Sequence, residues 1–215
     1  MKRVSRSIRI NRDEYLLFRN PDFIAINKPL GFEATAGKTP SSELRALITE
    51  MELANSDDCP VPVHSSSSST SGVLLLSMHA AAGKLARAMV KEGQFWKCKY
   101  WGLLDGRIAG RQSSGVINIP MSAGQVTSDG EPSITHWRLL KYTDQGVSLV
   151  EFEPRTNIQN QIQLHAELVL KAPLLSDTGL HLRQVSASLP TGESTEVVAP
   201  VRDRFRDAMV SLGWT

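Results

Sequence analysis

The most unusual stretch of this chain is a run of five serines, Ser65–Ser69, which follows His64 and precedes Thr70-Ser71-Gly72. A serine hydroxyl is a weak nucleophile unless a neighbouring base takes its proton. His64 is the nearby candidate base, but the chain has no Gly-x-Ser-x-Gly turn of the kind that presents the nucleophile of a hydrolase. The run is therefore interpreted as a polar loop, and a Ser-His hydrolase is kept as the weaker alternative.

With its flanks, this segment resembles the signature of the RluA-type RNA pseudouridine synthases, which is His-Arg-Leu-Asp-Arg-Asp-Thr-Ser-Gly ahead of an apolar strand. His64, Thr70-Ser71-Gly72 and the apolar run Val73–Leu76 match this pattern. Enzymes of this family break the C1′–N1 bond of a uridine, turn the base over and rejoin it through C5. The resemblance places the catalytic aspartate of the family at Ser67, and a serine does not supply the carboxylate that an aspartate carries at neutral pH.

A second segment, Thr156–His165, resembles the family's Thr-Gly-Arg-Thr-His-Gln-Ile-Arg-Val-His. Four positions match, namely Thr156, Gln161, Ile162 and His165. In the family, the arginine at the position of Gln163 pairs with the catalytic aspartate and holds it ionised and oriented. Without its carboxylate this arginine would be a costly buried charge. Because Ser67 and Gln163 replace both partners together, we expect a pseudoenzyme that has lost its catalytic residues.

A third segment, Phe95–Gly106, resembles the family strand Lys-x-Tyr-x-Ala-x-x-x-Gly. Tyr100 matches the tyrosine that stacks against the target uracil, and the lysine of the family falls on Cys98. Aromatic residues also fill β cores without any ligand. Packing in the core therefore stays open as the alternative role of Tyr100.

Four further segments resemble the family and follow its order along the chain: Asp22–Gly31, Asp129–Thr135, Lys171–Asp177 and Leu189–Glu193. The third of them corresponds to the family's His-Pro-Ile-x-Gly-Asp, and the second to its Gly-Lys-x-Ala-x-Thr hairpin. The resemblance implies the α+β pseudouridine synthase fold, a bent and mainly antiparallel sheet with flanking helices and a central cleft. We expect a basic arm over residues 1–13 and one synthase-like domain over residues 14–215, without an S4-type RNA-binding domain.

Hydrophobic periodicity indicates where the elements lie. Apolar spacings of three, four and seven predict helices, as does an alanine-rich amphipathic stretch, and these cover Ser41–Leu53, His79–Glu92, Gln161–Val169 and Val201–Leu212. Alternation and short apolar runs predict strands, which cover Tyr15–Phe18, Phe23–Asn27, Val73–Ser77, Phe95–Leu104, Val116–Pro120, Thr135–Tyr142 and Val147–Glu153. This mixed order is typical of an α+β protein.

The composition narrows the class of protein. A chain of 215 residues with 41% hydrophobic residues suits one globular domain. No apolar stretch approaches the roughly 20 residues that span a bilayer, so we expect no membrane partner. Cys59 and Cys98 are too few for a disulfide framework, and the five histidines lack ligand spacing. We therefore expect no metal and no cofactor.

The net charge is only +2, but basic residues concentrate at the N-terminus and in the middle of the chain. Such clusters suit contacts with RNA phosphates, which give affinity without sequence information. The candidate RNA-binding residues are Arg3, Arg6, Arg9, Lys84, Arg87, Lys91, Lys97, Lys99, Arg107 and Arg111. An ordinary solvated surface is the alternative for the middle cluster.

The sequence thus predicts a catalytically inactive, RNA-binding ribosome assembly factor or ribosome-associated scaffold. Its expected partners are structured RNA, with ribosomal RNA favoured, and ribosomal or assembly-factor proteins. One alternative is an active synthase for ribosomal or transfer RNA that uses another carboxylate, such as Asp57, Asp58 or Asp177; another is a protein adaptor without RNA. The Arg- and Ser-rich N-terminus resembles a mitochondrial transit peptide, which favours mitochondria over the cytoplasm, while an RNA-binding tail or a first strand stays open.

Overall fold

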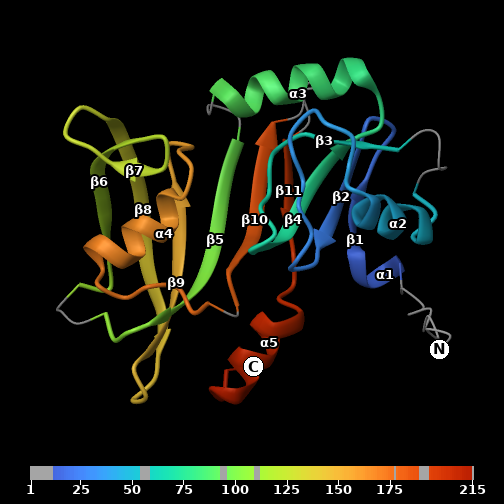
Figure 1. Cartoon of the computed structure of the whole chain (residues 1–215). Coiled ribbons are helices and arrows are strands. Elements are labelled where there is room, and N and C mark those ends of the chain that lie inside the picture. Colours follow the sequence, from blue (N-terminus) through green and yellow to red (C-terminus); the bar gives the residue numbers. More distant parts are fainter. Residues whose placement is uncertain are drawn as a thin grey trace, which may run out of the picture.

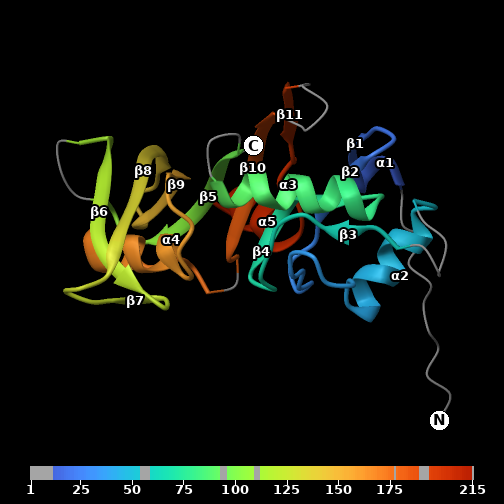
Figure 2. The same ribbon diagram turned by 90° about the horizontal axis from the view of Figure 1, so that it is seen from above.

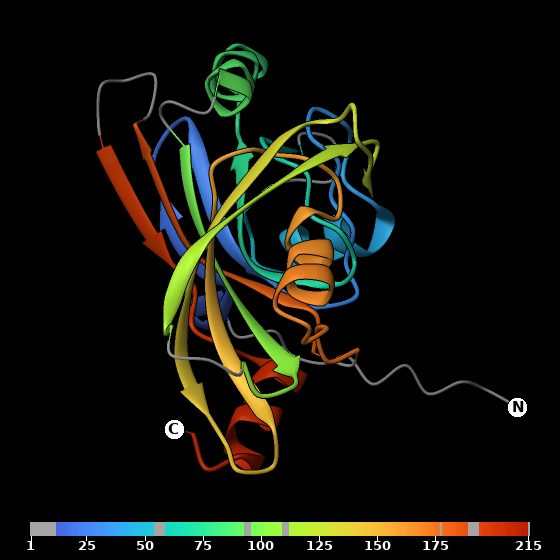
Figure 3. The same cartoon turned by 90° about the vertical axis from the view of Figure 1, so that its left-hand side faces the viewer.

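One mixed sheet runs through the computed structural model, which describes residues 12–53, 59–92, 96–108, 112–176, 178–188 and 194–214. Its strands are β1 (Leu16–Arg19), β2 (Phe23–Lys28), β3 (Val61–Pro62), β4 (Thr70–Ser77), β5 (Trp96–Asp105), β6 (Ser114–Ser122), β7 (Gln125–Val126), β8 (Glu131–Tyr142), β9 (Val147–Pro154), β10 (Leu180–Ser188) and β11 (Ser194–Val198). They lie in the order β1-β2-β4-β10-β5-β9-β8-β6-β7, with β11 paired to β10 and β3 paired to β4. Figure 3 shows how strongly the strands curve.

The helices cover this sheet from several sides (Figure 1). They are α1 (Arg12–Tyr15), α2 (Ser42–Glu50), α3 (Ala80–Glu92), α4 (Gln161–Leu164), the π-helix η1 (His165–Val169) and α5 (Asp203–Ser211). Only the pairing of β4 with β10 is parallel among the strand pairs of the described residues. The expected α+β class with a bent, mainly antiparallel sheet is confirmed.

The apolar run Val73–Leu76 lies in β4 and is buried on both faces of the sheet. Successive side chains of a strand point to opposite faces, so Val73 and Leu75 join one core cluster while Leu74 and Leu76 join another. The second cluster is covered by α2, which contributes Leu44, Leu47 and Ile48. A strand covered on both faces has no need for polar alternation, which is why this run is continuously apolar.

The predicted helices are present, with different bounds. Ser41 caps α2, because its side chain accepts a hydrogen bond from the backbone N–H of Leu44. The helix expected over Gln161–Val169 is α4 followed directly by η1, in which the N–H of Leu170 bonds to the carbonyl of His165. None of the helices in the described ranges has the length and apolar character needed to cross a membrane.

The sequence patterns missed four strands of the described residues, the two-residue strands β3 and β7 and the longer β10 and β11. β10 is central, since it pairs with β4 on one side and with β5 on the other. Of the expected basic arm, residues 1–11 lie outside the described residues, as does the whole Leu189–Glu193 segment that resembles the family's closing turn.

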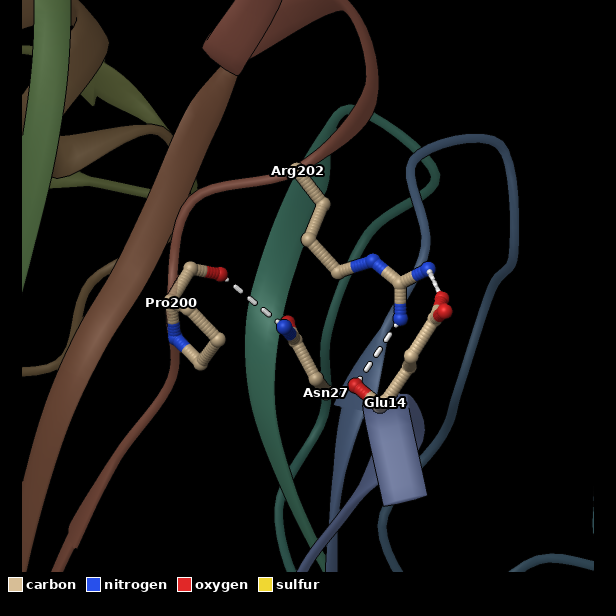
Figure 4. Close-up of polar contacts among 4 residues, drawn as sticks. All are labelled: Glu14, Asn27, Pro200 and Arg202. Atoms are coloured by element: carbon tan, nitrogen blue, oxygen red, sulfur yellow. Dashed lines mark hydrogen bonds and ion pairs between the residues drawn. The ribbon is translucent and has the colours of Figure 1, made fainter. Parts of the chain in front are cut away.

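The segment before α5 ties the C-terminal part of the chain to its first described elements (Figure 4). The guanidinium of Arg202 donates to the backbone carbonyl of Glu14 at 2.9 Å and to its carboxylate at 2.8 Å. It also lies 3.9 Å from the centre of the Tyr15 ring. The side-chain amide of Asn27 donates to the carbonyl of Pro200 at 2.9 Å. These contacts join the segment directly before α5 to α1 and β2.

Candidate functional site

A cavity of about 600 Å³ opens over β5. The helix α3, which lies across the top of the sheet in Figure 1 and toward the viewer in Figure 2, forms one wall together with the loop before β4. The start of β8 and the loop after β9 form the other. The lining residues are Ala36, Val63, His64, Ser65, Arg87, Val90, Lys91, Trp96, Lys97, Cys98, Tyr100, Glu131, Pro132, Pro154, Arg155, Thr156, Asn157 and Ile158. The expected central cleft therefore exists, and parts of all three resembling segments line it.

Tyr100 lies on the floor of this cavity, on the same face of β5 as Trp96 and Cys98. Burial, followed by the nearby Cys98 thiol, raises the pKa of Tyr100 well above its ordinary value. Burial likewise raises the pKa of Cys98 to about 12. Both groups therefore stay protonated at neutral pH, so Tyr100 offers the cavity an aromatic ring and a neutral hydroxyl rather than a base.

The serine run lies at the edge of the cavity. Ser65 lines it, whereas Ser67 is exposed and is not among the lining residues of the described chain. The hydroxyl of Ser67 is 3.0 Å from that of Ser69 and 3.0 Å from that of Thr70. Because Ser67 is exposed, a carboxylate at this position would be in contact with solvent.

Beneath the serine run, Lys28 is buried and only 1% exposed. Its ammonium group donates to the backbone carbonyls of Phe32 at 2.6 Å, Ser67 at 3.1 Å and Pro29 at 3.2 Å, and it also contacts the carbonyl of Thr70. Burial lowers the pKa of Lys28 to about 8. Lys28 therefore stabilises the conformation of the serine run through hydrogen bonds to backbone carbonyls, which do not depend on the side chains of the run.

His64 does not activate a serine. Its Nε2 accepts a hydrogen bond from the backbone N–H of Leu75 at 3.2 Å, so its proton lies on Nδ1, which is 3.3 Å from the carbonyl of Ser65. Burial, as the largest cause, lowers the pKa of His64 to about 4. Both ring nitrogens are engaged with the backbone, so the geometry does not support the Ser-His hydrolase.

The second resembling segment forms the loop after β9 and enters α4. Gln161 is buried and organises this loop, because its Oε1 accepts from the Thr156 hydroxyl at 2.9 Å and from the Ile158 N–H at 3.2 Å. Its Nε2 donates to the Ile134 carbonyl at 2.9 Å and to the Thr135 hydroxyl at 2.8 Å. Gln163 is half-buried on α4 and, like Ser67, is absent from the described lining of the cavity.

The structure brings together only part of the candidate RNA-binding set. Arg87 and Lys91 of α3 and Lys97 of β5 line the cavity. Lys84 is exposed on α3 and Lys99 is half-buried on β5, and neither reaches the cavity among its described lining residues. Arg107 follows the opposite end of β5, where it lies 5.1 Å from the centre of the Tyr142 ring. The remaining candidates, Arg3, Arg6, Arg9 and Arg111, lie outside the described residues.

Among the charged and aromatic residues that line the cavity, three were not candidates from the sequence: Trp96, Arg155 and Glu131. Alternation along β5 could have identified Trp96, because it lies four residues before Tyr100 and so faces the same side. Arg155 directly precedes a matching motif residue. The cavity thus has four cationic side chains and one carboxylate in its described lining. Groups of three or more metal-ligating side chains are absent from the part of the chain that the structure describes.

Comparison with known proteins identifies the family. The family model described as RNA pseudouridylate synthase matches residues 22–168, which is more than half of the chain. An uncharacterized RNA pseudouridine synthase of Zymomonas mobilis is 29% identical over 171 residues, which cover 75% of this chain and 76% of that protein. Ribosomal large subunit pseudouridine synthase C of Rickettsia typhi is 28% identical over 173 residues, covering 76% of this chain and 55% of that protein.

Two further comparisons agree with these. RNA pseudouridine synthase 4, mitochondrial, of Arabidopsis thaliana is 26% identical over 191 residues, covering 75% of this chain and 39% of that protein. The solved structure of human RNA pseudouridylate synthase domain containing 4 superposes with a TM-score of 0.76 at 20% identity, covering 94% of each chain. The expected pseudouridine synthase fold is confirmed.

The family match corrects one prediction. The chain was expected not to be an enzyme, because Ser67 and Gln163 stand where the family has aspartate and arginine. This expectation is wrong, since the matching family model and the relatives are all described as synthases. The inference relied on two positions, neither of which belongs to the described lining of the cavity. The chain belongs to the RNA pseudouridylate synthase family and is of the RluA type.

Proposed function

We propose that this protein is an RNA pseudouridine synthase that isomerises a uridine in structured RNA, with ribosomal RNA as the favoured substrate. The observation that carries the proposal is the cavity over β5, which combines the Tyr100 ring on its floor with a cationic rim. The resemblance implies that Tyr100 stacks against the target uracil. Relatives named for the large ribosomal subunit support ribosomal RNA as the substrate.

The rim suits the RNA backbone. Arg87, Lys91, Lys97 and Arg155 bring positive charge to both walls of the cavity. Arg155 also pairs with Glu153 at 3.0 Å, which orients its guanidinium from the loop after β9. Contacts between such side chains and phosphates position RNA without reading its sequence.

The carboxylate that acts on the sugar comes, in this proposal, from a position other than 67. Glu131 is the acidic residue in the described lining of the cavity. Glu131 occupies the position at which the resembling hairpin of the family has a lysine. The cavity therefore has a carboxylate at position 131, whereas position 67 has a serine in place of the family's aspartate. Asp57, Asp58 and Asp177, the carboxylates considered from the sequence, lie outside the described residues.

Tritium release tests the proposal. Isomerisation replaces the C5–H bond of the uridine by a C5–C1′ bond, so ribosomal and transfer RNA labelled with tritium at C5 should release label into water. Substituting a proton-transfer or nucleophilic group typically slows a reaction by about 10²–10⁴. We expect such a loss for Glu131→Gln, a loss for Tyr100→Leu, and normal turnover for Ser67→Ala and for the control Tyr142→Leu.

The outcomes separate the parts of the proposal. If the wild-type protein releases no tritium from either RNA, the proposed function is wrong. If the wild type is active and Glu131→Gln is equally active, the carboxylate lies elsewhere, and Asp57, Asp58 and Asp177 are the next positions to substitute.

The cellular setting also remains a prediction. Ribosomal or assembly-factor proteins are the proposed partners, and co-purification of the native protein followed by sequencing of crosslinked RNA tests this. The mitochondrial name of the Arabidopsis relative supports mitochondria as the compartment. Fractionation of cells that express the native chain would decide between mitochondria and cytoplasm.

A further inference from the structure

Trp96 is a second aromatic ring at the cavity, four residues before Tyr100 on the same strand. It is half-buried and lines the cavity, while its other contacts are with the core cluster that contains Val73 and Leu75. Its ring centroid is 5.2 Å from that of His64, and the two planes are tilted by 50°. The indole is therefore held in place before any ligand arrives, which lowers the entropy cost of binding.

Cationic side chains line the same cavity as this ring. Arg87 and Lys91 line the same cavity from α3, and Lys97 follows Trp96 directly on β5. Aromatic rings set among basic side chains are the combination with which proteins bind single-stranded nucleic acid, since bases stack on the rings while the backbone follows the charges.

The spacing of the two rings selects the form of RNA. Trp96 and Tyr100 are four residues apart on one strand, which is roughly 13 Å at about 3.3 Å per residue. Bases stacked in a duplex are about 3.4 Å apart along a strand. One base on each ring therefore requires a strand whose bases are unstacked and splayed, as in loops and bulges of RNA.

From these observations we propose that Trp96 stacks on a nucleotide near the target uridine, so that the substrate is an unpaired RNA segment from which two bases enter the cavity. This inference rests on the proposed function, because it assumes that Tyr100 receives the target base. It adds a second contact that favours unpaired loops over duplex. The phosphates between the two bases then lie beside Arg87, Lys91 and Lys97.

Binding of RNA hairpins with an unpaired uridine-containing loop tests the proposal, with a fully paired duplex of the same composition for comparison. Removing a stacking ring typically weakens binding by an amount that corresponds to about tenfold or more. We expect Trp96→Leu to weaken loop binding about tenfold, Trp96→Phe to retain most of it, and neither to change duplex binding.

Trp101→Leu is the matched control. Trp101 is half-buried on the same strand but faces the other side, where Arg183 lies 4.9 Å from its ring centre. Its loss should leave RNA binding unchanged. Thermal melts of each variant check that the fold is retained.

An abasic scan of the loop identifies the base concerned. Removing the base that meets Trp96 should weaken binding by the wild type about as much as Trp96→Leu does, and combining the two changes should cost no more than either alone. The scan needs no change in the protein, so it decides the question even if Trp96→Leu does not fold. A wild-type protein that is indifferent to every flanking abasic site, or a Trp96→Leu variant that binds like Trp101→Leu, would overturn the proposal.

Failure of this inference is distinguishable from failure of the proposed function. If the wild type isomerises uridine while Trp96 is dispensable for loop binding, only the second stacking contact is wrong. If the wild type neither binds loops nor releases tritium, the proposed function itself is wrong.

Discussion

The ammonium nitrogen of Lys28 lies 3.1 Å from the backbone carbonyl oxygen of Ser67. The contact joins the end of β2 to the serine run and does not involve the Ser67 hydroxyl. A buried charged donor that serves several carbonyls specifies the path of the main chain. The run therefore keeps a defined conformation at the edge of the cavity although its side chains are all small hydroxyls.

We expect Lys28→Met to destabilise the protein by about 3 kcal/mol, because four backbone carbonyls, one buried and three partly buried, would lose a charged donor. Chemical denaturation measures this loss. Hydrogen exchange at Ser66 and Thr70, whose N–H groups bond to Ala34 and Ser67, should rise at the same time. Lys38→Met, at an exposed position, is the control. Unchanged exchange in Lys28→Met would show that Lys28 does not hold the run.

Stability should fall in acid below pH 6.5. Burial lowers the pKa of His64, His165 and His181 to about 4, from an ordinary value of 6.5. Above pH 6.5 these rings are neutral in both the folded and the unfolded state, so they do not make the free energy of unfolding depend on pH. Between pH 6.5 and 4 the unfolded chain takes up protons that the folded chain does not. Each ring therefore lowers the free energy of unfolding by about 1.4 kcal/mol for every unit by which the pH falls.

Urea titrations at a series of pH values measure this slope. His181 lies between Ser71 and the carbonyl of Ala199, with contacts of 3.0 Å and 3.1 Å. Replacing it in His181→Gln should remove about a third of the slope, since it is one of three such rings. A slope that is the same in the variant and the wild type would contradict the proposed neutral state of His181.

Gln161→Leu should destabilise the protein by about 3 kcal/mol, because four partner groups would lose their hydrogen bonds while the side-chain volume is nearly kept. The loop 154–158 would lose its anchor to β8, so turnover should fall together with stability. Gln159→Leu, at an exposed position two residues earlier, is the matched control. Equal melting temperatures for the two variants would count against the anchoring role of Gln161.

Charge-reversal variants on β5 should show that Lys97 and Lys99 contribute differently to RNA binding, although the sequence alone gives both as candidate RNA-binding residues. Lys97 lines the cavity, whereas Lys99 is half-buried opposite Gln184 of β10. Lys97→Glu should weaken RNA binding. It should also reduce the slope of the logarithm of the binding constant against the logarithm of salt concentration by about one, since fewer counterions are released. Lys99→Glu should have a smaller effect. Equal losses for the two variants, measured at several salt concentrations, would place the RNA outside the cavity.

Local sequence determined a large part of the fold. The spacing of Leu44, Leu47 and Ile48 behind Ser41 predicted the helix α2, and the apolar run Val73–Leu76 predicted a strand, which is β4. These predictions are confirmed because periodicity and capping depend on residues within a few positions of one another. The resembling segments were sufficient for the family, because they follow its order along the chain.

Tertiary structure decided the remainder. The apolar–polar alternation of Leu180–Arg183 is short, because the register of β10 shifts between Leu182 and Gln184, and the central place of β10 comes from pairing with β4 and β5, which are far away in the chain. The same long-range pairing brings Trp96 and Arg155 to one cavity and leaves Arg107 at the far end of β5. Spacing along a sequence fixes which face of a strand a side chain takes, but only packing between distant segments fixes which side chains meet.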